Sequence, residues 1–134
     1  MPGQPWIRAA LLAGAAYFFI GRVFALPAHD VRLWRFAAWV VSGVVYATHI
    51  GYERYRLRTS PGPGALHVAV AVAIGAFLLA VAGMVHSIAT ASTLRPVWLL
   101  ALVLWPVITA APAFVGALVA GTVLARVARR PDSP

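Results

Sequence analysis

The side chains that could do chemistry gather in one stretch of the chain, between Arg35 and Glu53. At alternating steps of four and three residues it presents a row of polar and aromatic groups: Arg35, Trp39, Ser42, Tyr46, His49 and Glu53. These steps align side chains on one face of a helix. The opposite face is mostly valine and alanine, which suit lipid. Because hydrocarbon cannot satisfy polar groups, we expect this row, the polar stripe, to face protein or water.

Within the polar stripe, His49 and Glu53 stand one helical turn apart and could share a proton or form an ion pair. The simpler interpretation is a local pair at the membrane edge, where Arg54, Arg56 and Arg58 neutralise Glu53. On this interpretation Glu53→Gln is a mild change. The sharper interpretation is a proton or cation step in a transporter, which usually requires an ionisable group deep in the membrane.

A second pairing joins His49 with His67, which should lie at a similar depth on the next helix. Two such histidines could ligate a b-type haem from opposite faces. The alternative is a pair of hydrogen-bonded histidines, and no flanking pattern supports haem. We therefore expect no cofactor and no metal.

Catalytic residues are not evident. His29 and Asp30 form an acid–base pair in a predicted loop, without a nucleophile or third member. Ser42 and the other hydroxyl side chains lack a companion base at a recognisable spacing. We expect that the protein is not an enzyme.

Composition sets the class of protein. The chain has 134 residues, 62% of them hydrophobic and 10% charged, against about a quarter charged in soluble domains. This indicates an integral membrane protein. Cysteine is absent, which excludes disulfides and thiolate chemistry. The net charge of +8 comes from arginines at segment ends, a pattern of membrane anchors rather than of a nucleic-acid surface.

The elements that position the polar stripe are four predicted transmembrane helices, at about residues 6–26, 33–52, 65–89 and 97–125. Each is near or above the roughly 20 residues that a bilayer requires. They predict an all-α, polytopic membrane protein, a single domain over 1–134 arranged as an up-down bundle. Pro27 follows the first segment, which we expect to be retained as a helix rather than cleaved as a signal peptide. Thr59–Gly64 is predicted to be a turn, and Pro106 and Pro112 predict a kink in the last helix.

The arginines also predict orientation. With the N-terminus inside, seven arginines lie on the cytoplasmic side: Arg8, Arg54, Arg56, Arg58, Arg126, Arg129 and Arg130. Four lie on the other side: Arg22, Arg32, Arg35 and Arg95. Both termini are therefore predicted to be cytoplasmic, in a bacterial inner membrane.

Small residues at spacings of four predict where helices pack closely, because helices in lipid associate through close contact. The predicted packing residues are Gly14 in the first segment and Ala113, Gly116, Ala117 and Gly121 in the last. A charge at Gly116 or Ala117 should weaken assembly.

The chain is similar in length to the small multidrug-resistance transporters, but its first segment lacks the membrane-embedded glutamate of that family. We expect a non-catalytic accessory or scaffolding subunit of a larger bacterial membrane complex, respiratory or photosynthetic complexes being the first to examine. Its partners would be lipid and other membrane subunits or itself, not nucleic acid. One alternative is a small homodimeric transporter or channel that uses the Trp39, Tyr46, His49 and Glu53 face. Another is a redox protein that binds b-haem or quinone.

Overall fold

The computed structural model describes residues 4–91 and 95–129, and this part of the chain is helical without strands. The helices, in order, are α1 (Pro5–Val23), α2 (Val31–Gly51), the short π-helix η1 (Tyr52–Arg56), α3 (Pro61–Ala91) and α4 (Pro96–Val127). The all-α prediction is confirmed. Each predicted segment corresponds to one long helix. Arg130, counted among the cytoplasmic arginines, lies outside the described residues.

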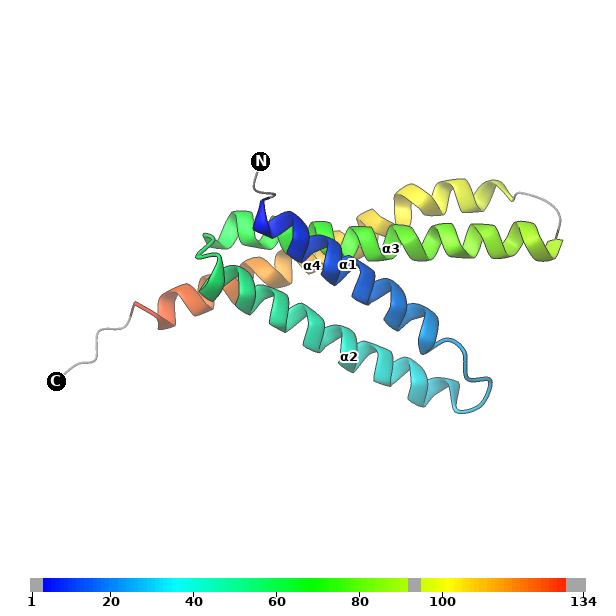
Figure 1. Ribbon diagram of the computed structural model, residues 1–134, viewed down its shortest axis with the longest axis horizontal. Helices are drawn as coiled ribbons and strands as arrows, with labels where there is room; N and C mark the ends of the chain where they lie inside the picture. The colour runs from blue at the N-terminus through cyan, green and yellow to red at the C-terminus, as the bar shows by residue number, and fades with distance from the viewer. Residues whose placement is uncertain (1–3, 92–94, 130–134) are drawn as a thin grey trace.

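The helices form two antiparallel hairpins, α1 with α2 and α3 with α4 (Figure 1). The α3–α4 pair runs along the long axis, and the α1–α2 hairpin crosses it at an angle. We call the end where α1 and α3 begin and α2 and α4 end the proximal end, and the opposite end the distal end. The most extensive contacts join α3 to α4 and α1 to α3, whereas α2 contacts the other helices much less.

Three helices, α1, α3 and α4, are long and apolar enough to cross a membrane. The fourth, α2, is not among them, because Arg32, Arg35 and the polar groups further along lower its hydropathy. A crossing by α2 therefore stays a prediction. With 31 residues, α3 is about 46 Å long, which exceeds a hydrocarbon core of about 30 Å.

The start of α3 differs from the prediction. The turn was expected to extend to Gly64, but the helix begins at Pro61. Proline is favourable in a first helical turn, where its missing N–H has no partner to lose and its φ already suits a helix. The N–H of Gly64 donates to the Ser60 carbonyl at 3.0 Å. The additional turn buries Gly64 and Ala65.

The two prolines for which a kink was predicted, Pro106 and Pro112, lie inside α4. Figure 1 shows α4 changing direction between its yellow and orange parts. Each proline removes one backbone donor. The Thr109 hydroxyl donates to the Trp105 carbonyl at 2.9 Å, a contact that often bends helices.

Glycine sets the crossing of α1 over α3. A Cβ at Gly75 would lie 2.6 Å from the Tyr17 Cβ and 3.0 Å from the Gly14 carbonyl oxygen. A Cβ at Gly14 would meet the Ile74 side chain at 2.7 Å. Only glycine at these positions allows the two backbones to approach so closely, as small residues do in membrane helix pairs.

The buried apolar core lies near the proximal end. It consists of Ile50 from α2, Ala65 and Val68 from α3, and Ala117 from α4. Val68 is completely buried. The buried residues of α2 are His49 and Ile50, both close to its C-terminus. The core therefore holds the end of α2 against α3 and α4.

Candidate functional site

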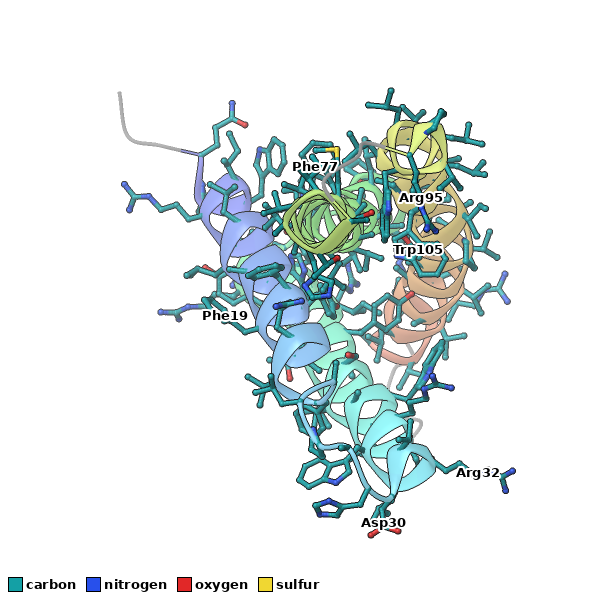
Figure 2. All side chains as sticks on the ribbon, turned by 90° about the vertical axis from the view of Figure 1, so that its right-hand side faces the viewer. Phe19, Asp30, Arg32, Phe77, Arg95 and Trp105 are labelled. Carbon is teal, nitrogen blue, oxygen red and sulfur yellow. The ribbon has the colours of Figure 1, made fainter. Side chains whose placement is uncertain are left out.

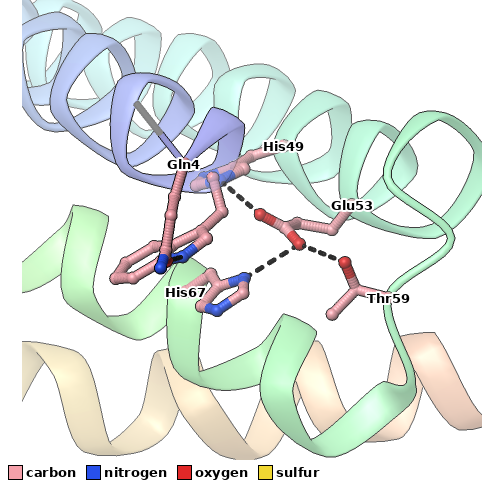
Figure 3. Close-up of polar contacts among 6 residues, drawn as sticks. Gln4, His49, Glu53, Thr59 and His67 are labelled. Carbon is pink, nitrogen blue, oxygen red and sulfur yellow. Dashed lines mark hydrogen bonds and ion pairs between the residues drawn. The ribbon is translucent and has the colours of Figure 1, made fainter. Parts of the chain in front are cut away.

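Beside this core, Glu53 is buried among hydrogen-bonding side chains from three segments (Figure 3). Its residue exposure is 2% and that of His49 is 5%. Its Oε2 accepts a hydrogen bond from the Thr59 hydroxyl at 2.8 Å and lies 3.0 Å from His67 Nδ1. We call His49, Glu53, Thr59 and His67 the Glu53 cluster.

The π-helix η1 positions the carboxylate. The wide turn is closed by the Leu57 N–H, which donates to the Tyr52 carbonyl at 3.1 Å. Arg58 then adopts a left-handed conformation with φ of 52°. This reversal brings the Thr59 N–H to the Glu53 carbonyl at 2.9 Å. Thr59 therefore holds Glu53 through both backbone and side chain. Short π-helical turns occur frequently at functional sites.

Trp6 covers the cluster from α1. Its ring stacks on the His67 imidazole with a centroid separation of 4.2 Å and an interplanar angle of 7°. The Trp6 indole N–H donates to the Gln4 side-chain oxygen, which fixes the ring (Figure 3). The cluster thus joins the start of α1, the end of α2 and the start of α3.

His49 has unused hydrogen-bonding capacity. Its Nε2 lies 3.7 Å from Glu53 Oε1, within ion-pair range but beyond a hydrogen bond. Glu53 Oε1 and both ring nitrogens of His49 are buried without a hydrogen-bond partner in the described part of the chain. Such groups are rare in folded proteins because an unpaired buried polar atom costs free energy. The predicted local pair of His49 and Glu53 is present, and His67, which the sequence placed at a similar depth to His49, joins it through the carboxylate of Glu53.

Histidines, rather than arginines, are the ionisable partners of Glu53. Among the described residues, no arginine forms an ion pair with Glu53, so neutralisation by Arg54, Arg56 and Arg58 does not take the form of a direct contact. Within η1 the chain turns Glu53 into the bundle and leaves Arg56 exposed. Glu53 therefore does not lie at an exposed edge, and Glu53→Gln should not be mild.

The remainder of the polar stripe divides along α2. The Tyr46 hydroxyl donates to the Ala113 carbonyl of α4 at 2.5 Å, and Ser42 is half-buried. Further from the bundle, Trp39 is 80% exposed and Arg35 is exposed. Because α2 diverges from α3 and α4 (Figure 1), only its C-terminal half meets the interior. Within one chain the stripe is therefore covered towards its C-terminal end and uncovered at Trp39, and the expectation that it faces protein or water stays a prediction there.

At the distal end a groove of about 220 Å³ separates α1 from α2. Phe24, Pro27 and Arg35 are among the residues that line it. Figure 2 shows Asp30 and Arg32 beyond it, pointing outwards from the tip of the hairpin. His29 and Asp30 are both exposed.

The predicted packing residues of α4 lie at helix contacts. Ala113 accepts the Tyr46 hydrogen bond, and a Cβ at Gly116 would lie 2.8 Å from the same hydroxyl. Ala117 is 2% exposed in the core. A Cβ at Gly121 would lie 3.5 Å from Pro61 of α3.

The geometry does not fit a haem between His49 and His67. Both side chains approach the same carboxylate, and Trp6 covers one face of His67. The cavity beside Glu53 has a volume of about 10 Å³, enough for about one water molecule. Cofactor pockets typically measure ~300–1,000 Å³. Nor do the described residues contain three side chains placed to hold a metal ion.

Comparison of the chain with protein-family models, with curated proteins and with solved structures finds no match. The chemistry of the site therefore rests on its own residues. Sequence reasoning did not place Trp6 at this site, and it assigned Thr59 only to a turn. The one available signal was that Trp6, His49 and His67 all belong to predicted helix ends on the same side of the membrane.

Proposed function

We propose that the protein is a non-catalytic integral membrane subunit, an accessory component of a larger assembly in a bacterial cytoplasmic membrane. The observation that carries this proposal is the uncovered part of α2. Arg35, Phe36 and Trp39 share one side of the helix, and we call them the α2 face. Phe36 is 67% exposed and Trp39 80% exposed, while Arg35 is also exposed.

Connectivity supports a crossing by α2. The helices α1 and α3 are both long and apolar enough to span a membrane. Both begin at the proximal end, where Trp6 stacks on His67. If α1 crosses the bilayer, the chain must return before α3 begins, and α2 runs antiparallel to α1 between them. This gives four crossings with both termini on one side, which the arginine distribution assigns to the cytoplasm.

A crossing by α2 would place the α2 face inside the membrane. Arginine is costly there and usually faces protein or a water-filled cavity. Trp39 lies about two turns from the start of α2, so the ordinary headgroup position of tryptophan does not account for it. A neighbouring membrane subunit that covers the α2 face would satisfy both side chains. This is the basis for an accessory role.

The test uses the absence of cysteine from the chain. Trp39→Cys creates a single thiol on the α2 face, and Val103→Cys creates a control thiol on α4. Val103 is 68% exposed and lies at a similar distance from the distal end. After mild detergent extraction, a thiol cross-linker should join position 39 to a membrane protein that co-purifies in fixed stoichiometry. Position 103 should give no such adduct.

Equal adducts at the two positions, or none at either, would contradict the proposal. An adduct formed only between two copies of this 14.2 kDa chain would favour a homodimer and hence the second candidate function.

That second candidate is a small homodimeric transporter or channel that moves protons or cations. The specific observation in its favour is the cluster of ionisable side chains formed by the buried His49 and Glu53 and the half-buried His67. Flux into liposomes of purified protein should then fall on His49→Gln or Glu53→Gln, whereas the exposed Asp30→Asn variant should behave as wild type. Liposomes that show no flux above the lipid background would eliminate this function.

A further inference from the structure

We propose that the groove between α1 and α2 at the distal end binds one anionic phospholipid, with the phosphate on Arg35 and an acyl chain along the groove. The groove has a volume of about 220 Å³. Apart from Arg35, the residues that line it are small or apolar: Gly21, Phe24, Ala25, Pro27, Val31 and Ala38. The proposal rests on the crossing of the membrane by α2 that is proposed above, but not on the accessory role.

The depth of the groove matches the border between lipid headgroups and acyl chains. Pro27 lies in the loop at the tip of the hairpin, and Ala38 lies about 10 Å along the axis of α2 from its first residue. Arg35 lies about 6 Å from the same point. Each interfacial layer of a bilayer is about 5–7 Å thick. The Arg35 guanidinium can therefore reach the headgroups while its stem stays beside apolar surface.

Aromatic side chains mark the same level. Trp34, in the first turn of α2, packs edge-to-face on Phe24, the residue that follows α1, with ring centroids 5.8 Å apart. Tryptophan favours the headgroup level of a membrane, and Phe24 also lines the groove. The mouth of the groove therefore lies where lipid phosphates are, and its inner end lies where acyl chains are.

The charge of the hairpin tip suits an anion. The tip carries three arginines and one carboxylate, hence a net charge of +2 with histidine neutral: Arg22, Arg32, Arg35 and Asp30. Within the described part of the chain, none of these four side chains forms an ion pair. A guanidinium binds phosphate through charge-assisted and often bidentate hydrogen bonds. A lipid phosphate therefore supplies the partner that the chain itself does not give Arg35.

An acyl chain suits the remainder of the groove, which is open to the surface of the protein. Apolar walls without a neighbour forfeit van der Waals contacts, and lipid chains are always present at this depth. A methylene group is about the size of a water molecule, which takes up ~30 Å³ of liquid, so the groove has room for roughly seven methylenes.

Charge and position separate the lipid from a protein occupant. A second copy of the chain would bring the same excess of arginine to the tip, and like charges repel. Phe36 and Trp39 of the α2 face do not line the groove, so a lipid bound there leaves both side chains available to another subunit.

The test is native mass spectrometry of the full, delipidated chain. The protein is released from detergent micelles that contain equal amounts of dioleoyl phosphatidylglycerol and dioleoyl phosphatidylcholine, which carry the same acyl chains but differ in net charge. We expect one bound phosphatidylglycerol per chain, in clear excess over phosphatidylcholine. Inorganic phosphate alone should give no adduct, because it lacks the acyl chain.

Two pairs of variants locate the lipid. Arg35→Gln should lower the affinity for phosphatidylglycerol about tenfold, because it removes charge-assisted hydrogen bonds. Its matched control is Arg32→Gln, which removes the same charge from a side chain that points outwards (Figure 2). Ala38→Leu should also weaken binding, since it fills part of the groove without a change of charge. Ala47→Leu, on an exposed part of the same helix, should not.

Circular dichroism checks that each variant is folded. If Ala38→Leu does not fold, Ala25→Leu takes its place, because Ala25 lines the groove and is exposed. Equal losses in Arg35→Gln and Arg32→Gln would show only a general attraction between arginine and anionic lipid, and would overturn the proposal.

Equal retention of the two lipids would also overturn it, as would wild-type affinity in the groove-filling variant, a retained phosphate ion, or a dimer of the chain in place of the lipid adduct. The spectra are recorded on the isolated chain, whereas the cross-link at position 39 requires a partner. Failure of lipid binding is therefore distinguishable from failure of the accessory role.

Discussion

Replacement of Gly75 by alanine should push α1 away from α3. The new Cβ would lie 2.6 Å from the Tyr17 Cβ and 3.0 Å from the Gly14 carbonyl oxygen. Carbon atoms in favourable contact are about 3.5–4.0 Å apart, so α1 would have to move by roughly 1 Å. Overpacking of this kind costs about 1–3 kcal/mol, and the higher helix propensity of alanine returns about 1 kcal/mol. We expect a net loss of up to about 2 kcal/mol in the free energy of unfolding.

The matched control is Gly43→Ala in α2, where an added Cβ meets nothing within 4 Å. This variant should be neutral or gain up to about 1 kcal/mol. Unfolding of both proteins by SDS in mixed micelles, followed by far-ultraviolet circular dichroism, measures the difference. If Gly75→Ala were as stable as Gly43→Ala, the close approach of α1 and α3 would not be what glycine provides there, and the reasoning would fail.

Three other substitutions test the packing of α2 and α4 by the same unfolding measurement. Tyr46→Phe removes the hydrogen bond to Ala113 and should lower the free energy of unfolding by about 0.5–1.5 kcal/mol. Tyr55→Phe, at a side chain 66% exposed, should leave that free energy unchanged, and equal losses in the two variants would show that the Tyr46 hydrogen bond does not stabilise the fold. Ala117→Asp buries an unpaired charge where the wild-type residue is 2% exposed. It should prevent folding or lower the free energy of unfolding by about 3 kcal/mol or more, and a variant of normal stability would show that Ala117 does not lie in a buried core. Trp39→Ala should change the free energy of unfolding of the isolated chain by no more than about 0.5 kcal/mol, while it reduces the amount of partner that co-purifies. A large loss of stability would show that Trp39 packs within its own chain.

Much of the fold follows from local properties of the sequence. Hydropathy and length predict α1, α3 and α4, because an apolar segment can satisfy its backbone within a membrane only as a helix. Periodicity predicts that His49 and Glu53 are neighbours, since residues four apart lie on one side of a helix, and the two side chains remain close although Glu53 lies in η1, just beyond the end of α2. The pairing of these two side chains was therefore predictable.

The start of α3 shows where local rules conflict. Proline and glycine between Pro61 and Gly64 indicate a turn, yet proline is also well suited to a first helical turn. The structure resolves this conflict in favour of the helix, because the additional turn brings Gly64 and Ala65 into the buried proximal end. Burial of that kind depends on neighbouring helices that the local sequence does not specify.

The sequence by itself determined a helical chain of membrane-like composition and the neighbouring positions of His49 and Glu53. Only the tertiary structure decided that Trp6, Thr59 and His67 complete the cluster around Glu53. It also decided that Trp39 lies outside the bundle. The angle between the two hairpins carries the N-terminal half of α2 away from α3 and α4, whereas its C-terminal end stays packed against them. Helical periodicity fixes which side chains share a face over a few turns, whereas the register, crossing angle and π-helical turn that join distant segments depend on packing among all the helices.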